Sequence, residues 1–219
     1  TLTFNVTATD PDAGQSVTLE GSGAPFQVNP SATFPPVTGI PPVTGTFNWS
    51  PGCGAIRSQA YLATFKATDN DLLTPLADFE SVNITVVGPP ITGLTAIPSG
   101  SSMNLSWNAN VCSNAVQYKI YRKDACGTWQ HGPCETGVPP ISGYTLIGTT
   151  TSLSFIDNNN GQGLAQGVSY SYIVVSVFPD GSESFASAES CAQLIKDVPI
   201  ITNVSVDSTS QTIGRIFIR

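Results

Sequence analysis

Two short runs of alternating side chains, Met103–Trp107 and Tyr118–Lys123, constrain the fold of this chain more than any other feature. In the first run, apolar residues at positions 103, 105 and 107 alternate with polar residues at 104, 106 and 108. Alternate side chains share one face of a β-strand, so the two runs predict adjacent strands of an antiparallel sheet. Trp107 is large enough to anchor a core between two sheets. The segment Tyr170–Val174 alternates in the same way, about sixty residues further on.

The rest of the chain also favours short strands over helices. Its 20 glycines and 17 prolines fall between short apolar runs, and no segment shows sustained apolar spacing at three and four residues. A hydrophobic content of 40% argues against disorder. We therefore predict an all-β protein built from tandem β-sandwich domains.

Charge and hydropathy narrow the classes of partner. The net charge of −7 and the absence of a Lys/Arg cluster exclude nucleic acid as an expected partner. No apolar run approaches the roughly 20 residues that span a bilayer. The chain opens and closes inside strand patterns, at residues 1–9 and 214–219, so we expect an interior fragment of a longer protein. A missing signal peptide says nothing about secretion of such a fragment.

Strand and turn signals divide the chain into three parts. Residues 1–89 contain about five strand patterns, one short of a closed sandwich, and the first strand is expected before Thr1. Val87-Gly88-Pro89-Pro90 marks a boundary whose prolines stiffen the link into a semi-rigid rod. Residues 90–197 form the predicted second sandwich. Residues 198–219 would supply the first strands of a third module, because Ile201-Thr202 repeats Ile91-Thr92 at an offset of 110.

The second segment has two large aromatic residues in its first strand patterns and a leucine, a glycine and a tyrosine ahead of a later one: Trp107, Tyr118, Leu164, Gly167 and Tyr170. These residues give the segment a resemblance to a fibronectin type III domain. It implies that Tyr170 is a corner tyrosine, whose hydroxyl bonds to a neighbouring backbone group. Two departures are Gln166, where the family usually has proline, and a long insertion at 124–143.

The first segment resembles a cadherin-like or immunoglobulin-like module of bacterial surface proteins, through VTATDPDAG, GTFNWSP and FKATDND. Together with CETGVP, DNNNGQGL and FPDGSES, these motifs are similar to repeat regions of large Bacteroidota surface proteins. Those proteins carry gliding-motility-associated C-terminal domains and are exported by the type IX system. The resemblance implies a secreted, modular protein of the bacterial outer surface.

Four aspartates form the candidate metal site: Asp10 and Asp12 after one strand, Asp69 and Asp71 after another. Both pairs are expected at one pole of the first sandwich. Carboxylate oxygens gathered there suit Ca²⁺, which takes six to eight oxygen ligands. The alternative is that Asp-Pro and Asn-Asp are simply good turn formers.

The five cysteines favour disulfides over zinc, because no CxxC spacing occurs. Cys112 is expected at one pole of the second sandwich and Cys126 and Cys191 at the other, roughly 23 Å away along a seven-residue strand. The favoured pairing is Cys112 with Cys134 and Cys126 with Cys191. A local Cys126–Cys134 bridge is the alternative. Cys53 is left over, and its partner is expected outside the fragment.

Catalysis has little support in the sequence. The single histidine, His131, lies between two cysteines, and no GxSxG signature surrounds a serine. Trp129 and Tyr144, in or beside the insertion, are candidate binding residues, because exposed aromatics stack on sugar rings or anchor a protein partner. The alternative is that Trp129 covers the flank of its own domain.

We therefore expect a non-enzymatic stalk or adhesion region of a secreted surface protein, with other domains of the same chain as its first partners. Two alternatives remain open: a carbohydrate-binding or accessory region of a secreted hydrolase, and an interaction module of the type IX secretion or motility apparatus. Envelope proteins, surface proteins and glycans are the corresponding partners, and no cofactor other than calcium is implied.

Overall fold

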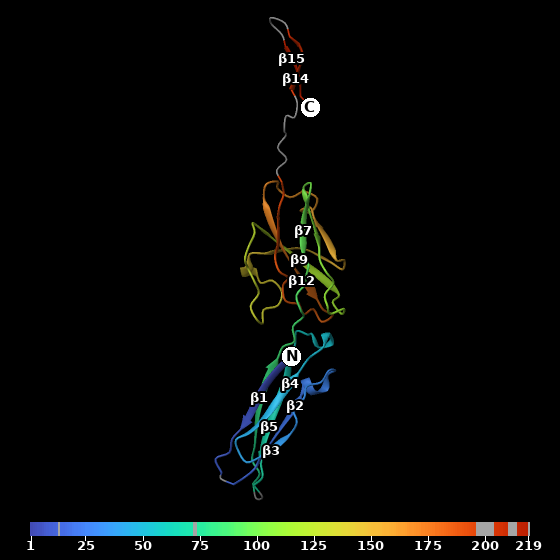
Figure 1. The fold of residues 1–219 in the computed structure, drawn as a ribbon. Helices are drawn as coiled ribbons and strands as arrows, with labels where there is room; N and C mark the ends of the chain where they lie inside the picture. Colours follow the sequence, from blue (N-terminus) through green and yellow to red (C-terminus); the bar gives the residue numbers. More distant parts are fainter. Residues whose placement is uncertain (13, 72–73, 196–203, 210–213, 219) are drawn as a thin grey trace.

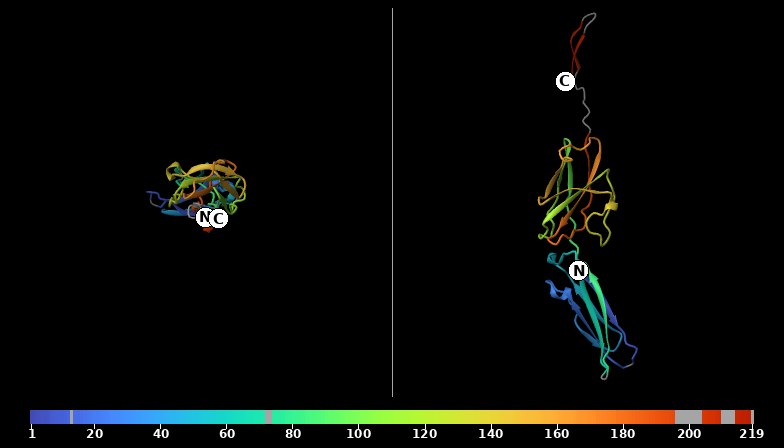
Figure 2. Two further views of the ribbon diagram at one scale, coloured as in Figure 1. Left: turned by 90° about the horizontal axis from the view of Figure 1, so that it is seen from above. Right: turned by 180° about the vertical axis from the view of Figure 1, so that it is seen from behind.

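The computed structural model describes residues 1–12, 14–71, 74–195, 204–209 and 214–218. These residues form β-strands and three short 3-10 helices, η1 (Ala24–Gln27), η2 (Cys53–Ala55) and η3 (Pro140–Ser142). The prediction of an all-β fold is confirmed. No helix among the described residues has the length and apolar character needed to cross a membrane. Two sandwiches lie end to end, so the molecule is elongated (Figures 1 and 2).

The first sandwich packs a two-stranded sheet on a four-stranded one. The smaller sheet pairs β1 (Leu2–Ala8) with β4 (Val43–Trp49). The larger has the order β3 (Val37–Gly39), β2 (Val17–Gly23), β5 (Tyr61–Asp69) and β6 (Ala77–Ile84). Strand β3 is short and lies between the Pro-Pro pairs at 35–36 and 41–42.

Alternation in β4 shows how the sequence builds this core. Its odd-numbered residues, from Val43 to Trp49, are buried, and the residues between them are exposed. The ring of Phe47 packs on Phe4 of β1 at 4.8 Å and edge-on against Phe65 of β5 at 6.0 Å. Aromatic pairs of this geometry add to the stability that burial alone provides. Trp49 is 1% exposed and donates a hydrogen bond to the carbonyl of Pro30 at 2.9 Å.

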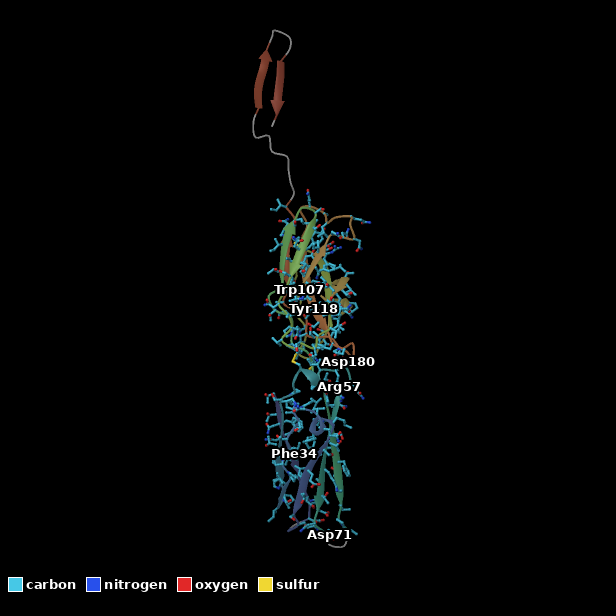
Figure 3. The ribbon with its side chains drawn as sticks, turned by 90° about the vertical axis from the view of Figure 1, so that its right-hand side faces the viewer. Phe34, Arg57, Asp71, Trp107, Tyr118 and Asp180 are labelled. Carbon is cyan, nitrogen blue, oxygen red and sulfur yellow. A yellow bond between two sulfur atoms is a disulfide. The ribbon has the colours of Figure 1, made fainter. Side chains whose placement is uncertain are left out.

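The second sandwich has seven strands in sheets of three and four. The smaller sheet has the order β11 (Ser154–Asp157), β8 (Ser102–Ser106) and β7 (Thr95–Ser99). The larger has the order β10 (Thr145–Thr150), β9 (Gln117–Asp124), β12 (Ser169–Val177) and β13 (Ser190–Gln193). The three alternating runs of the sequence fall on β8, β9 and β12 or their ends. Trp107 and Tyr118 meet between the sheets, 5.6 Å apart (Figure 3).

Tyr170 behaves as the fibronectin type III resemblance implies. It is 5% exposed, and its hydroxyl accepts a hydrogen bond from the backbone N–H of Ala165 at 3.0 Å. This contact ties the loop before β12 to the strand itself. The prediction of a corner tyrosine is confirmed.

Strand β12 is buried on both faces, which alternation alone does not predict. Tyr170, Tyr172 and Val174 face the core between the sheets, whereas Ile173 and Val175 belong to a second cluster with Tyr121 and Tyr144. Trp129 and Val138, from the insertion at 124–143, pack on this second cluster. The insertion therefore covers the outer face of the larger sheet.

The last described strands, β14 (Val204–Thr209) and β15 (Gly214–Ile218), form an antiparallel pair. They lie in the stretch assigned from the sequence to a third module. Residues 196–203 and 210–213 of that stretch lie outside the described residues.

Candidate functional site

The junction between the two sandwiches carries a covalent bond that the sequence analysis did not foresee. Cys53, in η2 after β4, is bonded to Cys112, in the loop between β8 and β9, with Cα atoms 5.4 Å apart. The predicted Cys112–Cys134 pair is therefore wrong, and so is the expectation that the partner of Cys53 lies outside the fragment. Cys112 does lie at one pole of its domain, but that pole faces the first sandwich, where Cys53 lies. Cys134 is exposed and has a free thiol.

Hydrogen bonds reinforce this bridge across the junction. The carboxylate of Asp180 accepts bonds from the backbone N–H of Ser58 at 2.7 Å and from its hydroxyl at 3.1 Å. The side-chain amide of Asn114 donates to the carbonyl of Cys53 at 3.0 Å. Figure 3 labels Asp180 and Arg57 close to the place where the two sandwiches meet. Ser58 belongs to the first sandwich and Asp180, 122 residues later, to the second. These bonds therefore form only when the two domains are docked.

The hydrogen bonds that the carboxylate of Asp180 accepts also affect its ionisation. Hydrogen bonds from the hydroxyl of Ser182, and then from the backbone of Ser58 and Ser182, hold the pKa of Asp180 well below its usual range. The charged form is the form that bonds to the first domain. Nothing in the sequence Pro179-Asp180-Gly181 itself indicates a contact with another domain.

A small apolar cluster fills the junction beneath these polar contacts. Ile56 of the first domain packs with Cys112 and Phe178 of the second, and these three residues are 8%, 4% and 1% exposed. Partly buried residues around them are Cys53, Val86 and Ala115. Burial of this kind stabilises the docked arrangement, since separating the domains would return the apolar surface to water.

The linker itself is fixed to the second domain. Asn110 is 7% exposed, and its amide donates to the carbonyl of Pro89 at 2.9 Å and to the hydroxyl of Ser176 at 3.0 Å. Gly88 accepts a bond from the N–H of Phe185, and a Cβ at Gly88 would lie 2.3 Å from the ring of Phe178. Only glycine therefore fits this close approach. The linker is part of the second domain's packing.

The second disulfide joins Cys126 to Cys191, with Cα atoms 5.6 Å apart, which is the pairing favoured from the sequence. It anchors the start of the insertion to β13. The carboxylate of Glu189 lies beside it and accepts bonds from the N–H of Gly127 at 2.7 Å and the hydroxyl of Tyr144 at 2.7 Å. Because the two sulfurs are bonded to each other, they are not available as thiolate ligands for a metal.

Tyr144, a candidate binding residue, is enclosed by the insertion. It is 6% exposed, and its hydroxyl bonds both to Glu189 and to Ser171. Burial raises the pKa of the Tyr144 phenol above its usual range. The premise that Tyr144 is an exposed aromatic is wrong, because the insertion folds back over the sheet that carries its hydrogen-bond partners.

Trp129 is half-buried and lies 6.3 Å from Tyr144, so it covers the flank of its own domain in part. It also lines an open groove of about 810 Å³. Three segments form the walls of this groove, at residues 90–94, 127–131 and 186–189. His131 lies in the same groove, its ring stacked on Phe185 at 4.5 Å and its Nδ1 bonded to the carbonyl of Gly132.

Of the four aspartates of the candidate calcium site, Asp10 and Asp12 follow β1, Asp69 is the last residue of β5, and Asp71 follows it. Figure 3 labels Asp71 at the end of the first sandwich that is remote from the junction. Asp10 accepts a bond from the N–H of Asp12, and Asp69 accepts bonds from the N–H groups of Asp71 and Leu76. Among the described residues, these carboxylates do not form a group of three within ligand distance of one another. Local turn contacts account for the bonds, and calcium binding stays a prediction.

Comparisons with known proteins find structures but no sequence relatives. No family model matches the chain. No curated protein matches it either. A two-domain fibronectin type III segment from chicken tenascin is similar over 87% of this chain and 91% of its own, with 12% identity and a TM-score of 0.42. Domains FN1–FN3 of chicken CNTN1 match over 83% of this chain, with 12% identity and a TM-score of 0.38.

Domains A168–A170 of titin match 89% of this chain and 59% of their own, with 14% identity and a TM-score of 0.38. The chain spans 54% of the CNTN1 segment. Because these TM-scores lie below 0.5, they support no functional argument. The sheets themselves show the architecture: two β-sandwiches in tandem, the second with the corner tyrosine of a fibronectin type III-like fold.

Proposed function

We propose that this chain is a non-catalytic, disulfide-locked spacer in the stalk of a secreted modular protein. The observation that carries the proposal is the junction, where a disulfide, an apolar cluster and three hydrogen bonds hold two sandwiches end to end. Domain pairs within one chain commonly move relative to each other when their interface is small. A covalent bond across the interface opposes that motion and keeps the pair extended.

Two disulfides are consistent with an oxidising compartment. The resemblance of the motifs to Bacteroidota repeat regions supports a place on the bacterial outer surface, with export by the type IX system. The role would be in surface attachment or gliding motility. In that setting, the spacer holds other domains of the same protein away from the cell.

A pulling experiment tests the mechanical part of the proposal. The disulfides join residues that are 59 and 65 positions apart, Cys53 with Cys112 and Cys126 with Cys191. A fully extended chain spans about 3.4 Å per residue, so these segments hide about 200 Å and about 220 Å of length. In single-molecule pulling, the contour length released on unfolding should therefore increase by these two lengths after the disulfides are reduced. A contour length that is the same with and without reductant would contradict a locked spacer.

A replacement experiment tests the biological part. In the producing bacterium, the region is deleted in frame or exchanged for an unrelated pair of β-sandwiches of similar length. A spacer predicts that deletion weakens surface attachment and that the unrelated pair restores it. Failure of the unrelated pair to restore attachment would show that the region makes specific contacts.

The groove beside Trp129 favours a second candidate function, which is carbohydrate binding. Aromatic side chains in open grooves stack on sugar rings, and the half-buried Trp129 lines this one together with Gln130 and His131. Glycan-array binding that is lost on Trp129→Ala, and retained on Trp107→Phe in the core, would favour this candidate over the spacer. If neither the unmodified chain nor the Trp107→Phe variant binds a glycan, the groove has no role in sugar recognition.

A further inference from the structure

The groove beside Trp129 has one carboxylate in its lining and no basic side chain other than a histidine. Glu189 lines the groove, and none of the other described residues around it is a lysine, an arginine or a second acidic residue. The other walls are apolar or neutral, and they include the buried Ile91 and Ala186. The groove volume of about 810 Å³ lies within the range of about 300–1,000 Å³ that is usual for small-molecule sites.

The carboxylate of Glu189 is held in place without being neutralised. Its two hydrogen bonds come from uncharged donors, the N–H of Gly127 and the hydroxyl of Tyr144, both at 2.7 Å. Among the described residues, no lysine or arginine forms an ion pair with it. A carboxylate has about four lone-pair sites, so about two of them remain available to a ligand.

Lys123 lies close to Glu189 but bonds elsewhere. A Cβ at Gly127 would lie 3.0 Å from a carboxylate oxygen of Glu189 and 3.8 Å from Nζ of Lys123. That Nζ donates a hydrogen bond to the carbonyl of Ser142 at 3.3 Å and lies 5.7 Å from the centre of the Tyr144 ring. Lys123 does not line the groove, so a ligand there meets the carboxylate and not this ammonium group.

His131 gives the groove a second hydrogen-bond acceptor. Its Nδ1 lies 2.9 Å from the carbonyl oxygen of Gly132, and because a carbonyl only accepts, Nδ1 carries the hydrogen. When the ring is neutral, Nε2 can then only accept. The stack on Phe185 fixes the plane of the ring. Glu189 and His131 therefore both favour a ligand that donates hydrogen bonds, and Glu189 favours one with a positive charge.

We propose that the groove binds a glycan whose sugar units carry a free amino group. Trp129 would stack on a sugar ring, and the ammonium group would bind the carboxylate of Glu189. A neutral glycan would lack this attraction, and a glycan with acidic groups would be repelled. The inference rests on the carbohydrate-binding candidate, for which it names the class of sugar, and it does not depend on the spacer function.

The test compares three oligosaccharides on the whole chain. They are hexamers of glucosamine, N-acetylglucosamine and glucose with the same linkage, which differ in carrying an ammonium, an acetamide or a hydroxyl group. Isothermal titration calorimetry at about pH 6 keeps carboxylates ionised and the amino groups largely protonated. We expect the glucosamine hexamer to bind about fivefold or more tightly than either of the others, as a partly screened charge pair would give.

Substitutions assign the preference to particular side chains. Glu189→Gln removes the charge and keeps an acceptor oxygen, so the three hexamers should then bind within about twofold of one another. Trp129→Ala should weaken the binding of all three by about fivefold or more. The matched control is Asp124→Asn, which removes an exposed carboxylate of the same domain outside the groove and should leave the preference unchanged. His131→Gln removes the other titratable side chain of the groove and should also retain the preference.

Salt supplies a second test that needs no substitution, in case Glu189→Gln does not fold. Raising the ionic strength from about 0.1 M to about 1 M shortens the Debye length from about 10 Å to about 3 Å. The advantage of the glucosamine hexamer should therefore shrink, while the binding of the glucose hexamer should stay the same. An advantage that is unchanged at high salt would contradict a role for charge.

The possible failures are distinguishable. Equal binding of the glucosamine and glucose hexamers would overturn the inference and leave the carbohydrate-binding candidate in place, whereas no binding of any hexamer would overturn both. An N-acetylglucosamine hexamer that binds as tightly as the glucosamine hexamer would overturn the inference, and so would a preference that survives Glu189→Gln. A lysine hexapeptide that binds as tightly would overturn it as well, since the groove would then recognise charge without a sugar.

Discussion

Removing the disulfide across the junction should cost about 4 kcal/mol of conformational stability. The perturbation is Cys53→Ser with Cys112→Ser. The bond joins residues 59 apart, and the chain-entropy relation for such a loop gives about 14 cal/mol/K, which is about 4 kcal/mol at 25 °C. The loop includes strands of both sandwiches, so the loss is shared between the domains. The remaining hydrogen bonds at the junction are largely exposed and contribute little in comparison.

The assay is urea denaturation followed by tryptophan fluorescence and far-ultraviolet circular dichroism, without reductant. We expect the summed free energy of unfolding to fall by about 4 kcal/mol and the two domains to unfold in separate steps. The control is Cys134→Ser, which removes an exposed free thiol and should change stability by less than about 0.5 kcal/mol. A loss below about 1 kcal/mol in the double variant, or an equal loss in the control, would refute the reasoning.

Three further predictions concern single sites. Asp157 is 3% exposed and ion-paired, so Asp157→Ala should destabilise the second domain by about 3 kcal/mol in urea denaturation, and an effect below about 1 kcal/mol would contradict a buried pair. A Cβ at Gly45 would lie 2.4 Å from the ring of Phe34, whereas one at Gly54 meets nothing within 4 Å. Gly45→Ala should therefore lower stability by about 1–3 kcal/mol and Gly54→Ala by much less. Equal melting temperatures of the two variants would contradict the packing around Gly45. Because the folded-state pKa of Asp180 lies below its unfolded value, its contribution to stability is present above about pH 4 and is lost as the pH falls further. Small-angle scattering should therefore show looser docking of the domains below about pH 4. An Asp180→Asn variant should show no such pH dependence.

Alternation in the sequence was sufficient to predict most of the strands. The runs around Trp107, Tyr118 and Tyr172 became β8, β9 and β12 or their ends, because one face of each must be buried. The pattern over Tyr170–Val174 predicts one buried face, whereas β12 is buried on both faces, and burial on both faces removes alternation. The pattern does not reveal that the insertion at 124–143 covers the outer face of the sheet that contains β12.

The disulfide error has a clear physical origin. Cys112 lies at the kind of position that the sequence predicts, a pole of the second sandwich, but its partner belongs to the other domain. Cys53 follows the last residues of β4 at the pole that leads into the linker, so a bond across the linker was the alternative that the geometry required. Local patterns carry no information about how two domains face each other.

The aspartates illustrate the same limit in a different way. A DxD sequence after a strand is equally suited to a turn and to a metal site, because carboxylate oxygens accept bonds from backbone N–H groups as readily as they bind calcium. In the structure, Asp10 and Asp69 accept such bonds. Melting of the chain with calcium and with chelator separates the two uses, and an equal melting temperature would remove calcium from the account.

Residual dipolar couplings of the two sandwiches, measured in one weakly aligned sample, test the locked junction most directly. Domains fixed to each other share one alignment tensor, whereas domains that move independently have tensors of different size and orientation. The account predicts one tensor for the oxidised chain and two after Cys53→Ser with Cys112→Ser. Two different tensors in the oxidised chain would contradict it.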